Sequence, residues 1–227
     1  MHKVLTLDLH RAALLLVDFQ EEQRAETNCL AFGLNDVLQR ARQILNAARR
    51  AGVPVFHAAY RRDYELVPPR PFEPRADNGE ASFSDKDSPL TEICPEVAPA
   101  GDEIVIYKND ASAFEEDTLT RRLRARDVEW LIVTGVWTEQ CVAASVRDAM
   151  AAGFRALIVK DACTSGTELM HQSAVLNLAN RLYGGAVADT QRVLALLSSS
   201  GAEVWYTDEP CPIRFTVENV NSEFAAL

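Results

Sequence analysis

The chain has 227 residues, of which 48% are hydrophobic and 25% are charged, and its formal net charge is −10 at pH 7. This length and balance allow a sizeable buried core and exclude a fibrous or disordered chain, so we predict a single globular domain over residues 1–227. The acidic charge argues against nucleic acid as a partner, because a nucleic-acid surface needs a basic patch that neutralises phosphates, and a small-molecule ligand is expected instead.

The first half of the chain begins with a strand, a helix and a second strand. AALLLV (residues 12–17) is a short continuous apolar run that ends at Asp18, as expected of a strand covered on both faces. The run is too short to cross a bilayer, so no membrane partner is expected. Apolar residues then recur at three- and four-residue steps from Leu34 to Ala48, which predicts a helix capped by Gly52. VPVFHA (residues 53–58) predicts the second strand.

Residues 61–101 interrupt this alternation. The segment is rich in proline and in charged residues, which indicates a long excursion over the surface rather than a linker between domains. Long loops of this kind often cover a functional site, so we expect this one to lie near the site.

After residue 101 strands and helices alternate again. The predicted strands are 103–107, 130–134, 156–160 and 185–188, and the predicted helices are about 115–126, 141–152, 171–182 and 190–199. Buried strands that alternate with helices predict an α/β fold, because parallel strands need crossover helices that cover both faces of the sheet. Residues 207–227 lose this periodicity and are expected to form a tail at a subunit contact.

Three residues suited to catalysis follow three predicted strands. Asp18 ends the first strand and Lys108 follows EIVIY, while Cys141 comes after WLIVT and a short turn, where a helix begins. Because the carboxyl ends of parallel strands meet at one edge of a sheet, we expect these side chains to converge in one cleft.

Together the three residues favour acyl transfer to sulfur. A helix N-terminus and a nearby Lys108 stabilise a thiolate at Cys141, and Asp18 can accept the thiol proton and pass it to a leaving amine. Each residue alone has an ordinary structural explanation, such as a turn aspartate, an edge lysine or a small buried cysteine. We interpret the other four cysteines as small buried residues: Cys29, Cys94, Cys163 and Cys211. These irregularly spaced cysteines lack a Cys-x-x-Cys pair, which favours a reducing cytoplasm.

At these residues the sequence resembles the isochorismatase-like cysteine hydrolase superfamily, which includes N-carbamoylsarcosine amidases and ureidoacrylate and biuret-type amidohydrolases. The resemblance is carried by ALLLVDFQ, IVIYKNDASAF, LIVTGVWTEQCVAASVRDAMAAGF and LIVKDACTS, in that order. It implies a three-layer αβα sandwich with a mainly parallel sheet of about six strands, and a homodimer or homotetramer. It also implies a catalytic triad of Asp18, Lys108 and Cys141.

The resemblance further implies a cis peptide bond between Val136 and Trp137. In that arrangement the backbone N–H groups of Trp137 and Cys141 form an oxyanion hole for the substrate carbonyl oxygen.

The sequence departs from two branches of the superfamily. Nicotinamidases carry a metal site after the second strand, but VFHAAYRRD offers only His57, which we interpret as a packed strand residue. No metal or other cofactor is therefore expected, and His171 is interpreted as structural. Isochorismatases that act on a vinyl ether often lack the nucleophilic cysteine, so Cys141 favours an amide or ureide substrate.

Several further residues are candidates for contact with the substrate. The aromatic residues Phe19, Phe114 and Trp137 are candidate pocket walls, and Gln20 is expected to reach the pocket. Arg61, or its neighbour Arg62, follows the second strand and could clamp a substrate carboxylate. Glu139 is expected to point away from the thiol or to contact a substrate nitrogen.

The sequence thus predicts a cysteine-dependent amidohydrolase that cleaves a C–N bond of a small amide or ureide through a thioester and releases ammonia or an amine. Two alternatives stay open at this point. One is an isochorismatase-type vinyl ether hydrolase that uses Asp18 without covalent catalysis. The other is a non-catalytic binding protein on the same fold.

Overall fold

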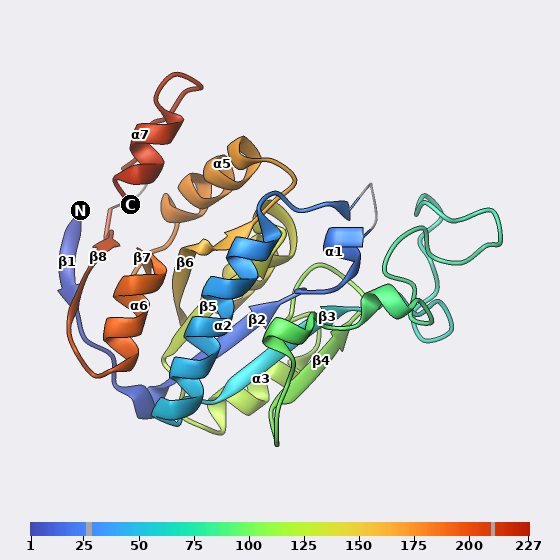
Figure 1. The fold of residues 1–227 in the computed structure, drawn as a ribbon, viewed down its shortest axis with the longest axis horizontal. Helices are drawn as coiled ribbons and strands as arrows, with labels where there is room; N and C mark the ends of the chain where they lie inside the picture. Colours follow the sequence, from blue (N-terminus) through green and yellow to red (C-terminus); the bar gives the residue numbers. More distant parts are fainter. Residues whose placement is uncertain (26–28, 210–211) are drawn as a thin grey trace.

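The structure is a computed structural model that describes residues 1–25, 29–209 and 212–227. In this part of the chain one sheet has eight strands in the order β1-β8-β7-β6-β5-β2-β3-β4 (Figure 1). The strands are β1 (His2–Leu5), β2 (Ala12–Val17), β3 (Val55–Tyr60), β4 (Ile104–Lys108), β5 (Trp130–Val136), β6 (Arg155–Thr164), β7 (Ala186–Ala188) and β8 (Ala202–Tyr206). The predicted α/β class with a mainly parallel sheet is confirmed.

The six predicted strands correspond to β2 to β7, which lie side by side and pair in parallel. The prediction of about six strands was low, because β8 pairs antiparallel with β7 and β1 pairs antiparallel with β8. Both are edge additions without a continuous apolar run: three of the four residues of β1 are exposed, and an exposed Glu203 interrupts β8. An antiparallel strand at an edge needs no such run, since one of its faces can meet water.

Seven helices occur in the described residues. They are α1 (Glu22–Ala25), α2 (Leu34–Ala51), α3 (Asp117–Arg124), α4 (Ala143–Ala151), α5 (Glu168–Ala179), α6 (Thr190–Leu197) and α7 (Val220–Ala225). A π-helical turn (Thr138–Val142) leads into α4. None of these helices combines the length and the apolar character that a bilayer-spanning helix needs.

The helices form layers on both faces of the sheet because β2 buries every side chain and alternates them between the faces. Leu14 and Leu16 belong to a core cluster that includes apolar residues of α2 and α6. Ala13, Leu15 and Val17 belong to a second cluster that includes residues of α3, α4 and α5. The two clusters account for the three-layer arrangement in Figure 1.

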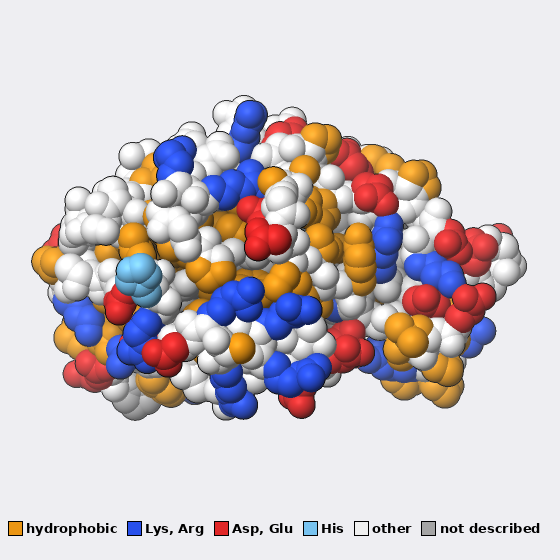
Figure 2. All heavy atoms as spheres, turned by 90° about the horizontal axis from the view of Figure 1, so that it is seen from below, with side chains coloured by type: hydrophobic (Ala, Val, Ile, Leu, Met, Phe, Trp, Pro, Cys, Tyr) orange, Lys and Arg blue, Asp and Glu red, His pale blue; other side chains and the backbone are white. Residues whose placement is uncertain are grey.

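Residues 61–101 form the long segment between β3 and β4, and part of it projects from the body of the protein (Figure 1). Figure 2 shows acidic and basic side chains together on the projecting part. Within the segment, Arg62 forms an ion pair with Glu73 and Lys86 forms one with Glu65. The segment is therefore held largely by polar contacts.

The C-terminal residues do not stay apart from the body. Helix α7 packs on α5, and Val220 and Leu227 are buried in the second core cluster. The Lys160 ammonium donates to the carbonyl oxygen of Phe224 at 2.9 Å, near the end of α7. The tail is thus docked on its own chain, and a subunit contact there stays a prediction. Cys211, predicted to be a buried cysteine, lies outside the described residues.

Candidate active site

Asp18 lies directly after β2, at the carboxyl end of the strand. Its φ is 50°, in the left-handed region that aspartate tolerates better than most residues. Its backbone N–H donates to the carbonyl oxygen of Ala58 at 2.9 Å, and the residue is 2% exposed. The turn therefore directs a buried carboxylate to the edge where β2 and β3 end.

Lys108 is the last residue of β4, and its side chain is fully buried. Its Nζ lies 2.8 Å from Oδ2 of Asp18 and donates to the carbonyl oxygen of Asp110 at 3.1 Å. The ammonium also lies 4.6 Å from the centre of the Tyr60 ring, at the end of β3. A buried charge is costly without a partner, so the two residues stabilise each other's charged forms.

Cys141 completes the group. It lies in the π-helical turn that leads into α4, so the helical backbone starts at Thr138, before the predicted residue 141, while α4 itself starts at Ala143. Its partly buried side chain interacts with both Asp18 and Lys108. The structure thus brings together the three residues that the strand-end pattern selected.

The pKa values of the three groups shift together. Burial raises the pKa of the Asp18 carboxyl, and the charge of Lys108 offsets only part of this rise. Burial alone would lower the pKa of Lys108, but the charges of Asp18 and Cys141 raise it. Burial and the neighbouring carboxylate raise the pKa of the Cys141 thiol, and Lys108 counteracts this only in part. These shifts favour a neutral thiol on Cys141 at rest, with the Asp18 carboxylate placed to accept its proton.

The peptide bond between Val136 and Trp137 is cis, as the family resemblance implied. Gly135 precedes it with a φ of 149°, and a Cβ there would lie 2.4 Å from the carbonyl oxygen of Val17. Only glycine allows β5 to approach the end of β2 this closely. The Trp137 indole N–H donates to Oε1 of Gln23 at 2.7 Å, which fixes the ring beside the reactive group.

A cavity of about 370 Å³ opens onto Asp18 and Cys141. Its wall combines residues after β2, β3 and β4, residues of the turn before α4, and two residues of the segment 61–101. The other lining residues are Glu22, Gln23, Cys29, Tyr60, Phe83, Ser84, Asp110, Ala111, Trp137 and Gln140. Phe83 stacks on Tyr60 with ring centres 5.8 Å apart. The site is therefore a small cavity with aromatic walls and several carboxylates.

Three residues predicted to contact substrate do not line this cavity. Phe19 is buried in the first core cluster, and Phe114 packs against the second with its ring 6.1 Å from that of Phe154. Gln20 is fully buried, and its amide bonds to the backbone of Tyr60 and Thr91. The assignments of these three side chains to the pocket are therefore corrected: all have structural partners elsewhere.

The two arginines after β3 also have ion-pair partners within the protein. Arg61 forms an ion pair with Glu92 at 2.6 Å and lies over the Tyr107 ring. The buried Arg62 guanidinium binds Glu73 through two nitrogens, at 2.5 and 2.8 Å. Neither residue lines the cavity, so the predicted carboxylate clamp is not formed.

Glu139 does not line the cavity, which agrees with the expectation that it points away and not with the alternative of a contact with a substrate nitrogen. Its Oε2 atom is buried and accepts no hydrogen bond from the described residues.

The two inner histidines have structural partners. His57 lies buried in β3 with Nε2 3.1 Å from Glu103. His171 Nδ1 lies 2.8 Å from the Thr138 hydroxyl, which donates to the carbonyl oxygen of Thr164. Burial lowers the pKa of His171 to about 4, so the ring stays neutral and braces the turn that holds Cys141. Among the described residues, no group of three or more His, Cys, Asp or Glu side chains is placed to hold a metal.

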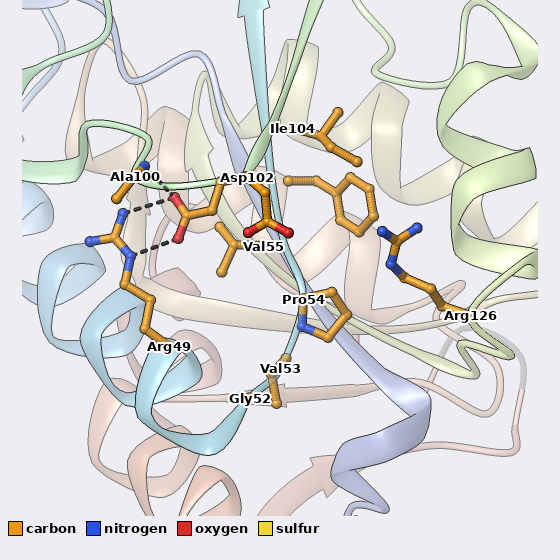
Figure 3. Close-up of a pocket in the computed structure, with 11 residues that line it drawn as sticks. Arg49, Gly52, Val53, Pro54, Val55, Ala100, Asp102, Ile104 and Arg126 are labelled. Carbon is orange, nitrogen blue, oxygen red and sulfur yellow. Dashed lines mark hydrogen bonds and ion pairs between the residues drawn. The ribbon is translucent and has the colours of Figure 1, made fainter.

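A second cavity, of about 350 Å³, lies where β3 and β4 begin (Figure 3). Arg49 binds Glu103 there through two nitrogens, at 2.7 and 2.8 Å, and so has its charge matched. This cavity is at the amino ends of the strands, away from Asp18 and Lys108. Because ligands of such sheets bind beyond the carboxyl ends, we assign the chemistry to the first cavity.

Sequence reasoning missed most of the cavity wall. Tyr60 and Asp110 follow β3 and β4, and Glu22 comes four residues after Asp18, so the strand-end rule could have found them. Phe83 and Ser84 come from the segment 61–101 and carry no sequence signal that identifies them.

Known proteins resemble this chain over most of its length. Residues 12–192 match the family model described as the isochorismatase domain. A maleamate amidohydrolase from Pseudomonas putida is 31% identical over 185 residues, which cover 78% of this chain and 83% of the relative. An N-carbamoylsarcosine amidase from Arthrobacter is 31% identical over 181 residues, which cover 74% of this chain and 63% of the relative.

The fold also has solved counterparts. The crystal structure of a cysteine hydrolase from Pseudomonas syringae pv. phaseolicola has a TM-score of 0.76 and 23% sequence identity with this chain. The similarity covers 86% of this chain and 96% of that chain, and it shows that the two share the fold.

Proposed function

This chain belongs to the isochorismatase family, and we propose that it is a cysteine-dependent amidohydrolase that cleaves a C–N bond of a small amide or ureide. The observation that carries this proposal is the buried Asp18–Lys108 ion pair beside Cys141, with Asp18 and Cys141 both lining one cavity. The names of two relatives, an amidohydrolase and an amidase, support the reaction class.

The first half of the proposed reaction acylates the cysteine. As the sulfur of Cys141 attacks the substrate carbonyl carbon, Asp18 accepts the thiol proton, which its raised pKa favours. Lys108 holds the carboxylate in place at 2.8 Å. The backbone N–H groups of Trp137 and Cys141 are proposed to receive the developing oxyanion. The C–N bond then breaks, and Asp18 returns the proton to the leaving ammonia or amine.

The second half hydrolyses the thioester. Asp18 removes a proton from water, the resulting hydroxide attacks the acyl carbon, and the thiolate leaves and takes the proton back. These steps restore the resting thiol and carboxylate without a metal or other cofactor. We also propose that the protein works in a reducing compartment as a homodimer or homotetramer.

An ammonia-release screen tests the proposed function. The panel contains small primary amides and ureides, with each carboxylic acid paired with its carboxamide, and the Cys141→Ala protein serves as the blank. We expect ammonia from at least one compound with the unsubstituted protein and none above background with the blank. Identical release by both proteins across the panel would exclude a cysteine-dependent amidohydrolase.

The pH dependence of kcat/KM should report the shifted groups. Asp18 must be unprotonated to accept the thiol proton, and burial raises its pKa above the ordinary value of about 4. Activity is therefore expected to fall as the pH falls through this raised value. No rise is expected around the ordinary thiol pKa of about 8.5, because the pKa of Cys141 is raised as well.

This profile is measured by ammonia release, with circular dichroism at each pH to separate titration from unfolding. An alkaline limb centred near the ordinary thiol value would show that the thiolate forms independently of Asp18, and would contradict the coupled proton transfer.

Gly166 supports the indole ring of Trp137. A Cβ at Gly166 would lie 2.6 Å from Cζ3 of that ring, so alanine must push the ring toward the cavity. We expect Gly166→Ala to reduce kcat/KM roughly tenfold or more, since small displacements of positioning groups are costly in catalysis. Steady-state kinetics on the amide identified by the screen measures the effect.

Gly185→Ala is the matched control for overpacking. Its Cβ would lie 2.5 Å from the carbonyl oxygen of Ala156, and Gly185 does not line the cavity. Both variants are expected to lose about 1–3 kcal/mol of unfolding free energy. Only Gly166→Ala is expected to alter the kinetic constants of the folded enzyme, and equal kinetic effects would remove the specific role of Gly166.

A further inference from the structure

The cavity wall is acidic. Asp18, Glu22 and Asp110 line it, and no lysine or arginine does so among the described residues. The five residues outside the description are Glu26, Thr27, Asn28, Pro210 and Cys211, and none of them is basic. Lys108 lies behind the wall and is paired with Asp18 at 2.8 Å. The described residues therefore bring several carboxylates to the surface that a substrate meets, and the cations that pair with two of them, Lys108 with Asp18 and Arg70 with Asp110, do not line it.

Three arginines near the cavity are bound to carboxylates: Arg61 and Arg62 have partners outside the wall, whereas Arg70 is paired with Asp110 of the wall itself. The Arg62 guanidinium, 3% exposed, binds Glu73, the carbonyl oxygen of Val67 and the side-chain oxygen of Asn109. Arg61 is bound to Glu92 and Thr91. Releasing any of these arginines for a substrate would leave a carboxylate without its ion pair, which is unfavourable for the buried Arg62–Glu73 pair in particular.

Glu22 is the carboxylate most firmly built into the wall. The residue is 3% exposed and accepts hydrogen bonds from the Ser84 backbone N–H at 3.0 Å, the Ser84 hydroxyl and the Gln23 amide. The side-chain oxygen of Gln23 in turn accepts a hydrogen bond from the indole N–H of Trp137. Ser84 adopts a φ of 50°, which aims its donors at Glu22. A chain of hydrogen bonds thus fixes Glu22 relative to the ring beside Cys141.

A fixed carboxylate in a small cavity discriminates between ligands by charge. An incoming carboxylate would be desolvated and placed near like charges, whereas an amide, ureide or ammonium group brings N–H donors. The rings of Tyr60, Phe83 and Trp137 also suit an uncharged or cationic group. Resting on the proposed function, we propose that this site selects amides and ureides that carry no carboxylate, and that Glu22 determines this selectivity, with a smaller contribution from Asp110, whose charge Arg70 offsets in part.

Alkylation of Cys141 tests the selectivity without a known substrate. Iodoacetamide and iodoacetate are nearly the same size and both transfer a two-carbon group to sulfur with loss of iodide, but only iodoacetate is an anion. Peptide mass spectrometry measures the labelling rate at Cys141 and separates it from Cys29, which also lines the cavity. The urea-unfolded chain gives the intrinsic rate ratio of the two reagents at the same cysteine.

We expect the folded protein to prefer iodoacetamide roughly tenfold or more beyond the intrinsic ratio. Glu22→Gln, which keeps the shape of the side chain, is expected to reduce this preference by at least about threefold. Asp110→Asn removes a carboxylate and leaves Arg70 without its ion pair, so it is also expected to lower the preference, and it provides a second variant if Glu22→Gln does not fold. A folded protein that labels with iodoacetate at or above the intrinsic ratio would overturn the inference.

An unchanged preference in both variants would overturn the roles of Glu22 and Asp110. Either failure is distinct from failure of the proposed function, which is judged by Cys141-dependent release of ammonia. Within that screen, the inference expects the carboxamide of each pair to be hydrolysed faster than the acid.

Discussion

Replacing Cys141 with serine is expected to reduce kcat/KM for the amide substrate by about four orders of magnitude or more. A serine hydroxyl is a far weaker acid than a thiol, so Asp18 cannot deprotonate it as readily, and the alkoxide leaves poorly from the acyl intermediate. Steady-state ammonia release measures the loss. Mass spectrometry of quenched reactions should show an acyl adduct on Cys141 in the unsubstituted enzyme, which would disappear in the variant.

Cys163→Ser is the matched control for the loss of a thiol. Cys163 is buried in β6, where its thiol lies 3.9 Å from the carbonyl oxygen of Val133, and it does not line the cavity. This variant is expected to keep its turnover. A Cys141→Ser protein that retains more than about a tenth of the activity would contradict the thioester mechanism. It would favour the ether hydrolase alternative, in which Asp18 acts without covalent catalysis.

Replacing Lys108 with methionine is expected to destabilise the fold by about 3–5 kcal/mol, because it leaves the Asp18 carboxylate buried without its partner. Lys108 is fully buried and 2.8 Å from that carboxylate, so solvent cannot substitute for the ammonium. Turnover is expected to fall by at least about 100-fold, since the base is neither held nor kept charged. Urea unfolding and ammonia release measure the two effects.

The double variant Asp18→Asn/Lys108→Met separates stability from catalysis. With both charges removed, most of the lost unfolding free energy should return, because replacing a buried ion pair with neutral groups is often nearly neutral. Activity should stay absent, since the base is gone. A double variant as unstable as Lys108→Met alone, or a Lys108→Met protein within 1 kcal/mol of the unsubstituted chain, would contradict the buried ion pair as described.

The reactive group was predictable because its geometry depends on a few local features. Apolar runs mark where β2, β4 and β5 lie, and parallel strands place the residues after their ends on one edge. That rule is enough to place Asp18, Lys108 and Cys141 together, and it does not depend on the conformations of the loops. It could not foresee the protonation balance, because the burial of the thiol depends on packing from several segments.

The rest of the site could not be predicted in this way. Phe83 and Ser84 reach the cavity through a segment without regular structure, so no periodicity locates them. Gln20 follows the reactive Asp18 closely, yet the backbone groups of Tyr60 and Thr91 draw its amide away from the cavity. Whether such a side chain faces ligand or protein depends on long-range partners that the local sequence does not reveal.

The bonds of Gln20 have a consequence for how this protein can change. The Gln20 amide forms hydrogen bonds with the backbone of Tyr60, just before the long segment, and with that of Thr91, near its far end. Arg61 adds a hydrogen bond to the Thr91 hydroxyl. Because the ends are pinned together, the cost of closing the intervening loop grows only slowly with its length. The length of residues 63–88 can therefore change at little entropic cost, because Gln20 keeps the two ends of the segment together close to Asp18.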